Sequence, residues 1–142
     1  EDFLIRTLSA AERYQETGII AYVDLDNFKQ VNDLHGHAAG DTVLKHVASI
    51  LRDNVRGSDL VARMGGDEFV LVLVRCGLHD GRKHIDRLTE VIERSPVTFG
   101  NIQIDIRASI GVEPYGPNSD AKTLLGRADA AMYQRKRRRA VA

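Results

Sequence analysis

The sequence predicts an α+β fold in which helices cover a central sheet. Two observations lead to this prediction. Short apolar runs rich in β-forming residues, such as 19–25 and 69–74, are separated by segments with helical periodicity. The predicted order of elements, αβααββαββα, places strands beside strands as well as beside helices, which is typical of a layered α+β domain. A chain of 142 residues fits one such domain with its own hydrophobic core.

The first half of the chain contributes three helices and one strand to this order. Apolar side chains recur at helical spacing over residues 2–16, and an apolar run over 19–25 is typical of a central strand. Asp26 is a good N-cap for a short helix over 27–34. A longer helix over 40–55 places its apolar side chains on one stripe, the pattern of a helix packed against a core.

The second half begins with a strand, a turn and a strand, because 60–63 and 68–75 flank two adjacent glycines. A helix over 79–94 presents one apolar face, and a proline follows it. Phe99-Gly100-Asn101 separates two β-like pieces, the second of which is 102–106 with clean alternation, and 108–112 continues as a strand. Residues 114–118 form a loop, and a final helix covers 120–137.

Composition excludes several classes of function. Twenty basic and twenty acidic residues balance, so no overall field recruits nucleic acid or anionic lipid. The single Cys76 cannot form an internal disulfide and suits a reducing, cytoplasmic location. The longest apolar runs are too short to span a bilayer. The sequence begins inside an amphipathic segment, which favours one domain (residues 1–142) cut from a longer protein.

The most informative feature is the turn Gly65-Gly66-Asp67-Glu68, which leads into an apolar strand. Two glycines allow a tight turn and the close approach of a ligand. Asp24 ends the first predicted strand among apolar neighbours, and a carboxylate there needs a partner. If the two strands are neighbours, Asp24 and Asp67 converge on one cation. Mg²⁺ accepts one or two carboxylates and completes its octahedron with phosphate oxygens and water.

The segment 27–41 offers groups that suit a nucleotide. A helix N-terminus after Asp24 presents free N–H groups, and Lys29 adds a positive charge; both favour phosphates. Asn32 and Asp41 provide an amide and a carboxylate. A carboxylate that accepts from N1–H and the 2-amino group of a purine, with an amide on the other edge, discriminates guanine from adenine.

These motifs, in this order, resemble the GGDEF family of diguanylate cyclases over residues 19–136. The resemblance is carried by four segments: 24–41, the R-x-G-G-D-E-F turn, Ser109 to Val112, and Ala128 to Tyr133. It implies a mostly antiparallel five-stranded sheet in two or three layers, like that of nucleotide cyclases and polymerase palms. It also implies that two copies face each other across a two-fold axis, each with one GTP. Their reaction yields cyclic di-GMP and two pyrophosphates.

The resemblance also assigns roles to individual residues. It implies Mg²⁺ or Mn²⁺ bound by Asp24, Asp67 and the Leu25 carbonyl, and Glu68 as a metal ligand or as the base for the 3′-hydroxyl. It implies guanine recognition by Asn32 and Asp41. The residues that it places around the rest of the nucleotide are Asn27, Phe28, Lys29, Gly65, Gly66 and Lys136.

A second site is implied by Arg56-Gly57-Ser58-Asp59, which resembles the R-x-x-D inhibitory site where cyclic di-GMP binds in this family. A guanidinium and a carboxylate can hold the edges of guanine, and arginine can also stack on the base. Arg87 on the next helix is a weaker candidate for a second arginine. The alternative is a helix-end arginine followed by a turn aspartate.

The sequence departs from the family at both ends. The D-x-L-T-G-L-x-N-R segment that usually precedes the first helix is absent. Near the C-terminus, Arg139 stands where the family has glycine, and Ala140 stands where it has arginine. Neighbouring arginines could substitute, or they could form a solvated basic helix end. Two other functions therefore remain open: a GTP-binding domain that no longer cyclises, as in proteins with a linked phosphodiesterase, and a cyclic di-GMP receptor.

Overall fold

A four-stranded antiparallel sheet in the order β2-β3-β1-β6 forms the middle layer of the molecule. The computed structural model describes residues 2–141, the last two by their backbone only. The elements are α1 (Asp2–Tyr14), β1 (Gly18–Leu25), α2 (Phe28–His35), α3 (His37–Asp53), β2 (Leu60–Gly65), β3 (Glu68–Val74), α4 (Leu78–Glu93), β4 (Val97–Phe99), β5 (Ile102–Ile104), β6 (Ala108–Tyr115) and α5 (Ala121–Val141).

The expectation of one five-stranded sheet is wrong in its strand count. β4 and β5 pair only with each other, as a separate hairpin of three residues per strand. The predicted strand over 102–106 stops at Ile104, and residues 105–107 lead into β6 without pairing in a strand. Two strands of three residues are too short to extend a twisted sheet, so the hairpin stands apart from the other four strands.

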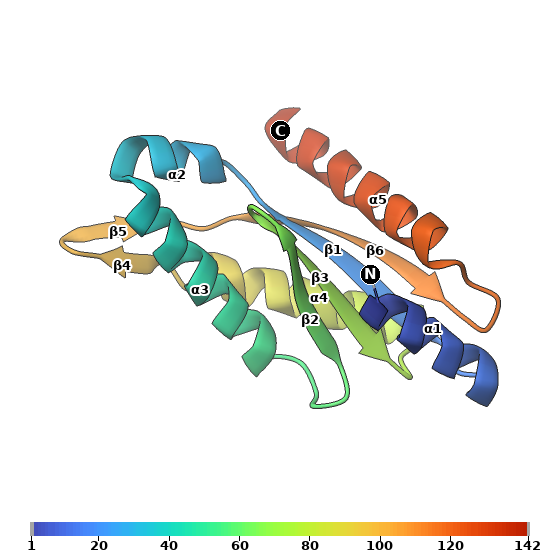
Figure 1. The fold of residues 1–142 in the computed structure, drawn as a ribbon. Helices are drawn as coiled ribbons and strands as arrows, with labels where there is room; N and C mark the ends of the chain where they lie inside the picture. Colours follow the sequence, from blue (N-terminus) through green and yellow to red (C-terminus); the bar gives the residue numbers. More distant parts are fainter. Residues whose placement is uncertain (1, 142) are drawn as a thin grey trace.

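Helices cover both faces of the sheet, which gives three layers (Figure 1). Alternation along the strands sends odd-numbered β1 residues to one face and even-numbered ones to the other. Ile19, Ala21 and Val23 join the larger core with α3 and α4. Ile20, together with side chains of β3, joins a smaller core with α1 and α5. The fold class predicted from the sequence is therefore confirmed, and the sheet lies between two helical layers.

Some boundaries differ from the sequence prediction for local reasons. α3 begins at His37 because Gly36, with φ of 90°, completes the turn from α2 by itself. β6 continues to Tyr115 through Pro114, which the sequence places in a loop. Proline is tolerated there because β6 is an edge strand, where a missing N–H does not break a ladder.

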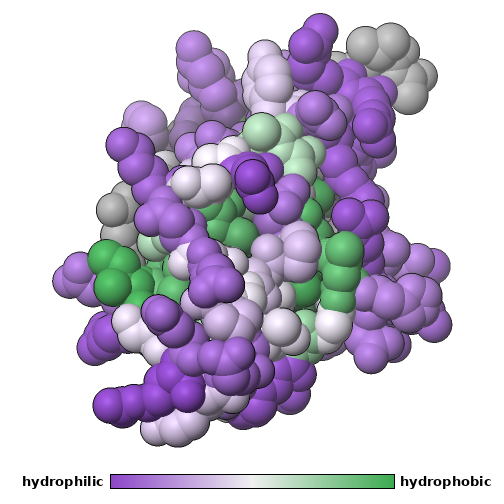
Figure 2. All heavy atoms as spheres, turned by 90° about the vertical axis from the view of Figure 1, so that its right-hand side faces the viewer, coloured by the Kyte–Doolittle hydropathy of each residue, from purple (hydrophilic) through white to green (hydrophobic). Residues whose placement is uncertain are grey.

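Polar side chains cover most of the surface, and apolar ones are visible as separate patches between them (Figure 2). The large exposed apolar side chains are scattered over different elements: Ile5, Tyr14, Leu34, Val91, Ile102 and Tyr133. Large apolar side chains that are scattered singly over a protein surface are ordinary and need no special explanation. Among the helices within residues 2–141, none has the length and apolarity that crossing a membrane would need.

Candidate functional site

Asp24 lies at the end of the central strand β1, directly opposite Glu68 of β3 and Ser109 of β6. Its side chain is only 15% exposed. Oδ2 accepts a hydrogen bond of 2.9 Å from Nζ of Lys136 on α5. Oδ1 is buried and has no hydrogen-bond partner among the described residues. A buried carboxylate oxygen without a protein partner is costly, so this atom is suited to a cation or a hydrogen-bond donor from a ligand.

Asp67 lies beside Asp24, as the sequence predicts. Its backbone carbonyl accepts from the N–H of Leu25 at 3.2 Å, which fixes the turn against the end of β1. The pKa of Asp24 is raised, chiefly because the carboxyl is buried; the hydrogen bond from Lys136 opposes this, and the charge of Asp67 adds to it. A buried carboxylate whose proton affinity is raised by a neighbouring negative charge also favours a divalent cation, which offsets that charge.

The donors present here fit a hard divalent cation. Asp24 and Asp67 supply carboxylate oxygens, and the unpartnered Oδ1 is available for coordination. Within the described part of the chain, no three His, Cys, Asp or Glu side chains converge on a common point. Such an incomplete set suits Mg²⁺, which takes few protein ligands and fills its shell with water and substrate phosphates. A structural Zn²⁺ site needs four protein ligands and does not fit.

The glycine turn places Asp67 and Glu68 next to the end of β1. Gly66 has φ of 36°, in the left-handed region that favours glycine. The carbonyl oxygen of Gly66 accepts from Nε of Arg63 at 3.0 Å, which closes the turn. A side chain added at Gly65 or Gly66 would meet no atom within 4 Å. The turn is therefore open on its outer side, where a ligand can approach the backbone.

Glu68 and Tyr22 extend the site along the same face of the sheet. Glu68 is opposite Asp24 in the β1–β3 register, so the two side chains leave the sheet on one side. The pKa of Tyr22 is strongly raised, first by burial and then by the neighbouring Glu68. Tyr22 is not among the site residues predicted from the sequence, although its two-residue spacing from Asp24 along β1 places it on the same face.

Asp26 contradicts the prediction that it caps the following helix. The N-cap of α2 is Asn27, in a left-handed conformation with φ of 58° and with no side-chain capping bond. Asp26 instead accepts from Oγ of Ser109 at 2.8 Å and forms an ion pair of 3.6 Å with Arg139. Its N–H donates to the Arg107 carbonyl, which extends the ladder one residue past β1 and keeps Asp26 on the face of Asp24. A long-range ion pair thus replaces the local cap.

The start of α2 lies next to these carboxylates. The N–H groups of Phe28 and Lys29 have no acceptor among the described residues, as is usual in a first helical turn without a cap. Lys29 is exposed, and Phe28 packs against the larger core. The free N–H groups and the positive end of the helix dipole make this an anion-binding position.

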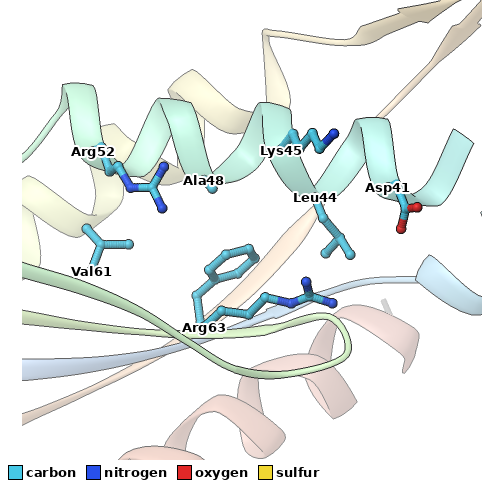
Figure 3. A pocket seen from close by; sticks show the side chains of 8 residues that line it. Asp41, Leu44, Lys45, Ala48, Arg52, Val61 and Arg63 are labelled. Carbon is cyan, nitrogen blue, oxygen red and sulfur yellow. The ribbon is translucent and has the colours of Figure 1, made fainter. Parts of the chain in front are cut away.

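Asn32 and Asp41 are brought together by the packing of α2 on α3. A Cβ at Gly40 would lie 1.9 Å from Oδ1 of Asn32, so only glycine allows the amide to rest against α3. Asp41 is the next residue and lines a cavity of about 440 Å³ between α3 and the β2–β3 hairpin. Figure 3 shows Asp41 at one end of this cavity, with Arg63 and Leu44 beside it. The other lining residues are Lys45, Ala48, Arg52, Val61 and Phe69.

Arg56 and Asp59 form a pair at the opposite end of the sheet. The Asp59 side chain is 2% exposed and accepts from the N–H groups of Arg56 and Val74 at 2.9 and 3.0 Å. Six residues of β3 separate this end from Glu68, or about 20 Å. Asp59 therefore has a structural role in closing the turn before β2, while the guanidinium of Arg56 stays half exposed. Arg87 is exposed on α4, and no ion pair joins it to either residue within the described range.

Comparison with known proteins places this arrangement in context. The family model "Diguanylate cyclase, GGDEF domain" matches residues 1–141. The chain is 39% identical over 129 residues to diguanylate cyclase DgcP of Pseudomonas aeruginosa, and 35% identical over 131 residues to diguanylate cyclase A of Treponema denticola. These matches cover 89% and 92% of the chain but only 19% and 35% of the two relatives. The chain thus spans about a fifth to a third of their lengths.

Solved structures agree with this similarity. Diguanylate cyclase SiaD of Pseudomonas aeruginosa, in complex with its activator SiaC, superposes with a TM-score of 0.90 at 33% identity, over 96% of this chain and 52% of that one. The GGDEF domain of DgcB from Caulobacter crescentus, in complex with c-di-GMP, gives a TM-score of 0.90 at 29% identity, over 96% and 81%. Fold and sequence point to the same family.

Proposed function

The chain belongs to the GGDEF domain family, and we propose that it condenses two molecules of GTP into cyclic di-GMP and two pyrophosphates. One observation carries the proposal. Asp24 presents a buried oxygen without a partner, next to Asp67 and beside the uncapped start of α2. A carboxylate pair with an unpartnered oxygen, beside an uncapped helix start, is suited to a metal-bound nucleoside triphosphate.

Each residue of the site has a role in this reaction. Asp24, Asp67 and the Leu25 carbonyl would hold Mg²⁺ or Mn²⁺, which when bound polarises the phosphates and neutralises their charge. Asn32 and Asp41 read the guanine, and the open turn at Gly65 and Gly66 lets the nucleotide lie against the hairpin. The phosphates are oriented by the N–H groups of the loop over 27–29 and by the side chains of Lys29 and Lys136.

In the chemical step, the 3′-oxygen of one GTP attacks the α-phosphorus of the other. The new bond is a 3′–5′ phosphodiester, the bond between the α-phosphorus and its bridging oxygen breaks, and pyrophosphate leaves. Glu68 would share in metal binding or accept the 3′-hydroxyl proton, and its projection from the same face of the sheet as Asp24 supports this role. A second transfer closes the ring.

Two copies of the domain are needed, since one site holds one nucleotide and the attack requires two. We expect a homodimer that forms during turnover with the two sites facing each other. Activity then rises faster than linearly with protein concentration, until the dimer is saturated.

The Arg56–Asp59 pair supports a second, regulatory role in which cyclic di-GMP inhibits its own synthesis. The half-exposed guanidinium is available to a guanine, and the buried carboxylate keeps it in place. The DgcB domain that this chain resembles binds c-di-GMP in its crystal structure. Arg87 is the candidate for a further contact to this ligand.

The decisive experiment is incubation with GTP and Mg²⁺, with pyrophosphate and cyclic di-GMP measured together. Wild type should form both, whereas Asp67→Asn and Glu68→Gln should lose activity while their thermal midpoints stay near that of wild type. Asp86→Asn, an exposed acid on α4, is the matched control and should keep full activity. Binding of GTP without turnover would instead indicate a non-cyclising regulatory domain. Binding of cyclic di-GMP without GTP would indicate a receptor.

A further inference from the structure

A small basic cavity adjoins the site on the side of α5. It has a volume of about 140 Å³ and lies between the β1–α2 loop, the segment before β6 and the last turns of α5. Its lining residues are Asp26, Asn27, Arg107, Lys136 and Arg139. Three cations and one carboxylate line it, while Asp24 and Glu93, which pair with two of these cations, are not among the lining residues.

The cations of this cavity are not fully neutralised. Lys136 lies 2.9 Å from Asp24 and 4.0 Å from Asp26. Arg139 pairs with Asp26 at 3.6 Å and with Glu93 at 2.5 Å, and its side chain is 27% exposed. Arg107 is exposed and forms no ion pair with any residue that the structure describes. Arg107 therefore lines the cavity with a positive charge that no carboxylate of the described residues neutralises.

Backbone N–H groups, like the cationic side chains, favour an anion in this cavity. Asn27 lines the cavity and is also the N-cap of α2, where the next two N–H groups have no acceptor among the described residues. Arginine presents a planar fork of donors that matches phosphate oxygens, often with two hydrogen bonds at once. Guanidinium groups, an ammonium group and free N–H donors around one small space suit phosphate oxygens better than a base.

We propose that Arg107 and Arg139 are ligands of the β- and γ-phosphates, acting together with Lys136. The proposal rests on the proposed function, since it takes the nucleotide to be held by its base and by the carboxylates as described above. On arrival of the phosphates, Lys136 and Arg139 exchange carboxylate partners for phosphate oxygens, and Asp26 keeps its hydrogen bond from Ser109. Pyrophosphate, the leaving group, then occupies the cavity after bond cleavage.

Inorganic pyrophosphate tests this site without any need for catalysis or guanine. Binding of pyrophosphate with Mg²⁺ is measured by calorimetry on wild type, Arg107→Ala, Arg139→Ala and the matched control Arg137→Ala, an exposed arginine on the same helix. A hydrogen bond between charged groups contributes about 1.5–3 kcal/mol, or roughly 10- to 100-fold in affinity. We expect each cavity variant to bind at least tenfold more weakly than wild type, and Arg137→Ala to bind within twofold.

A further variant separates direct contact from a merely structural role. Glu93→Gln removes a competing carboxylate from Arg139. If Arg139 binds phosphate, pyrophosphate affinity should stay equal or rise; if Arg139 only holds α5 in place, affinity should fall. Arg107→Ala provides the decisive result should Arg139→Ala fail to fold, because Arg107 is exposed and unpaired within the described chain.

Failure of this proposal and failure of the proposed function give different results. Wild-type protein that forms cyclic di-GMP, with Arg107→Ala and Arg139→Ala binding pyrophosphate within twofold of wild type, overturns the phosphate site alone. Tenfold weaker pyrophosphate binding by the variants of a protein without cyclase activity supports the site and overturns the function. No pyrophosphate binding by wild type overturns the site.

Discussion

Replacement of Gly111 by alanine tests how closely β6 must approach α5. An added Cβ would lie 2.1 Å from the Met132 nitrogen, 2.4 Å from the Ala128 oxygen and 2.7 Å from the Ala131 carbonyl carbon. All three are backbone atoms, so no side-chain rotation can relieve the contact. Ordinary contacts begin near 3.4 Å, so the helix would have to retreat by more than 1 Å. Lys136 lies one helical turn beyond Met132 and would be carried away from Asp24.

The expected loss of folding stability follows from this displacement of α5. Overpacking of a core costs about 1–3 kcal/mol, and a purely backbone clash belongs at the upper end. We expect unfolding to become easier by about 3 kcal/mol, which for a domain of this size lowers the thermal midpoint by roughly 10 °C. Urea unfolding followed by circular dichroism measures the free energy, and a thermal scan measures the midpoint.

Gly126→Ala is the matched control, because it makes the same substitution in α5, the helix that a side chain at position 111 of β6 would meet. A Cβ at Gly126 meets no atom within 4 Å, so the change should stabilise the helix by up to about 1 kcal/mol. The two alanine variants should thus shift stability in opposite directions. A Gly111→Ala protein within 1 kcal/mol of wild type would show that α5 is not held by this contact, and the positions assigned to Lys136 and Arg139 would lose their support.

Three further predictions concern selectivity, feedback and alkaline stability. Asp41→Ala should lower the preference for GTP over ATP in kcat/KM by about tenfold or more, since it removes a charged acceptor; unchanged selectivity would exclude Asp41 from guanine recognition. Arg56→Ala should relieve inhibition by added cyclic di-GMP at an unchanged initial rate, and inhibition that persists would mean that another site binds the product. Burial raises the pKa of Tyr115 to about 12, above its ordinary value of 10.0. Its protonated form therefore stabilises the fold below pH 10, and this contribution is lost as the pH rises from about 10 to about 12. Urea unfolding should show a smaller loss of stability across this range for Tyr115→Phe, and equal losses would refute the assignment.

The sequence predicts most of the fold because its signals are local. Hydrophobic patterns locate the longer helices and most strands of the sheet, since a buried face imposes its spacing on the residues that form it. The strand count is wrong because pairing is not local: the alternation at 102–106 does not say whether β5 joins the sheet or only β4. Pro114 is placed in a loop for the same reason, since only the topology shows that β6 is an edge strand.

In the candidate site too, local signals predict some features, and long-range contacts decide the others. The juxtaposition of Asp24 and Asp67 is predictable because each ends or begins a strand with a strong local signal, and the structure brings the two together. The role of Asp26 is not predictable, because its partners Ser109 and Arg139 lie far along the chain. Local chemistry favours an N-cap there, and a long-range ion pair prevails over it.

The last turns of α5 match the end of β1 in spacing as well as in charge. Asp24 and Asp26 are two residues apart on one strand face, or about 7 Å. Lys136 and Arg139 are three residues apart on one helix face, or about 5 Å along the axis. Each cation can therefore reach its own carboxylate, at 2.9 Å for Lys136 with Asp24 and 3.6 Å for Arg139 with Asp26. The pairing needs α5 close to the sheet, which the missing side chain at Gly111 permits. On the proposed function, Lys136 and Arg139 would release these carboxylates to bind phosphate oxygens, and Asp24 would then be available to the metal.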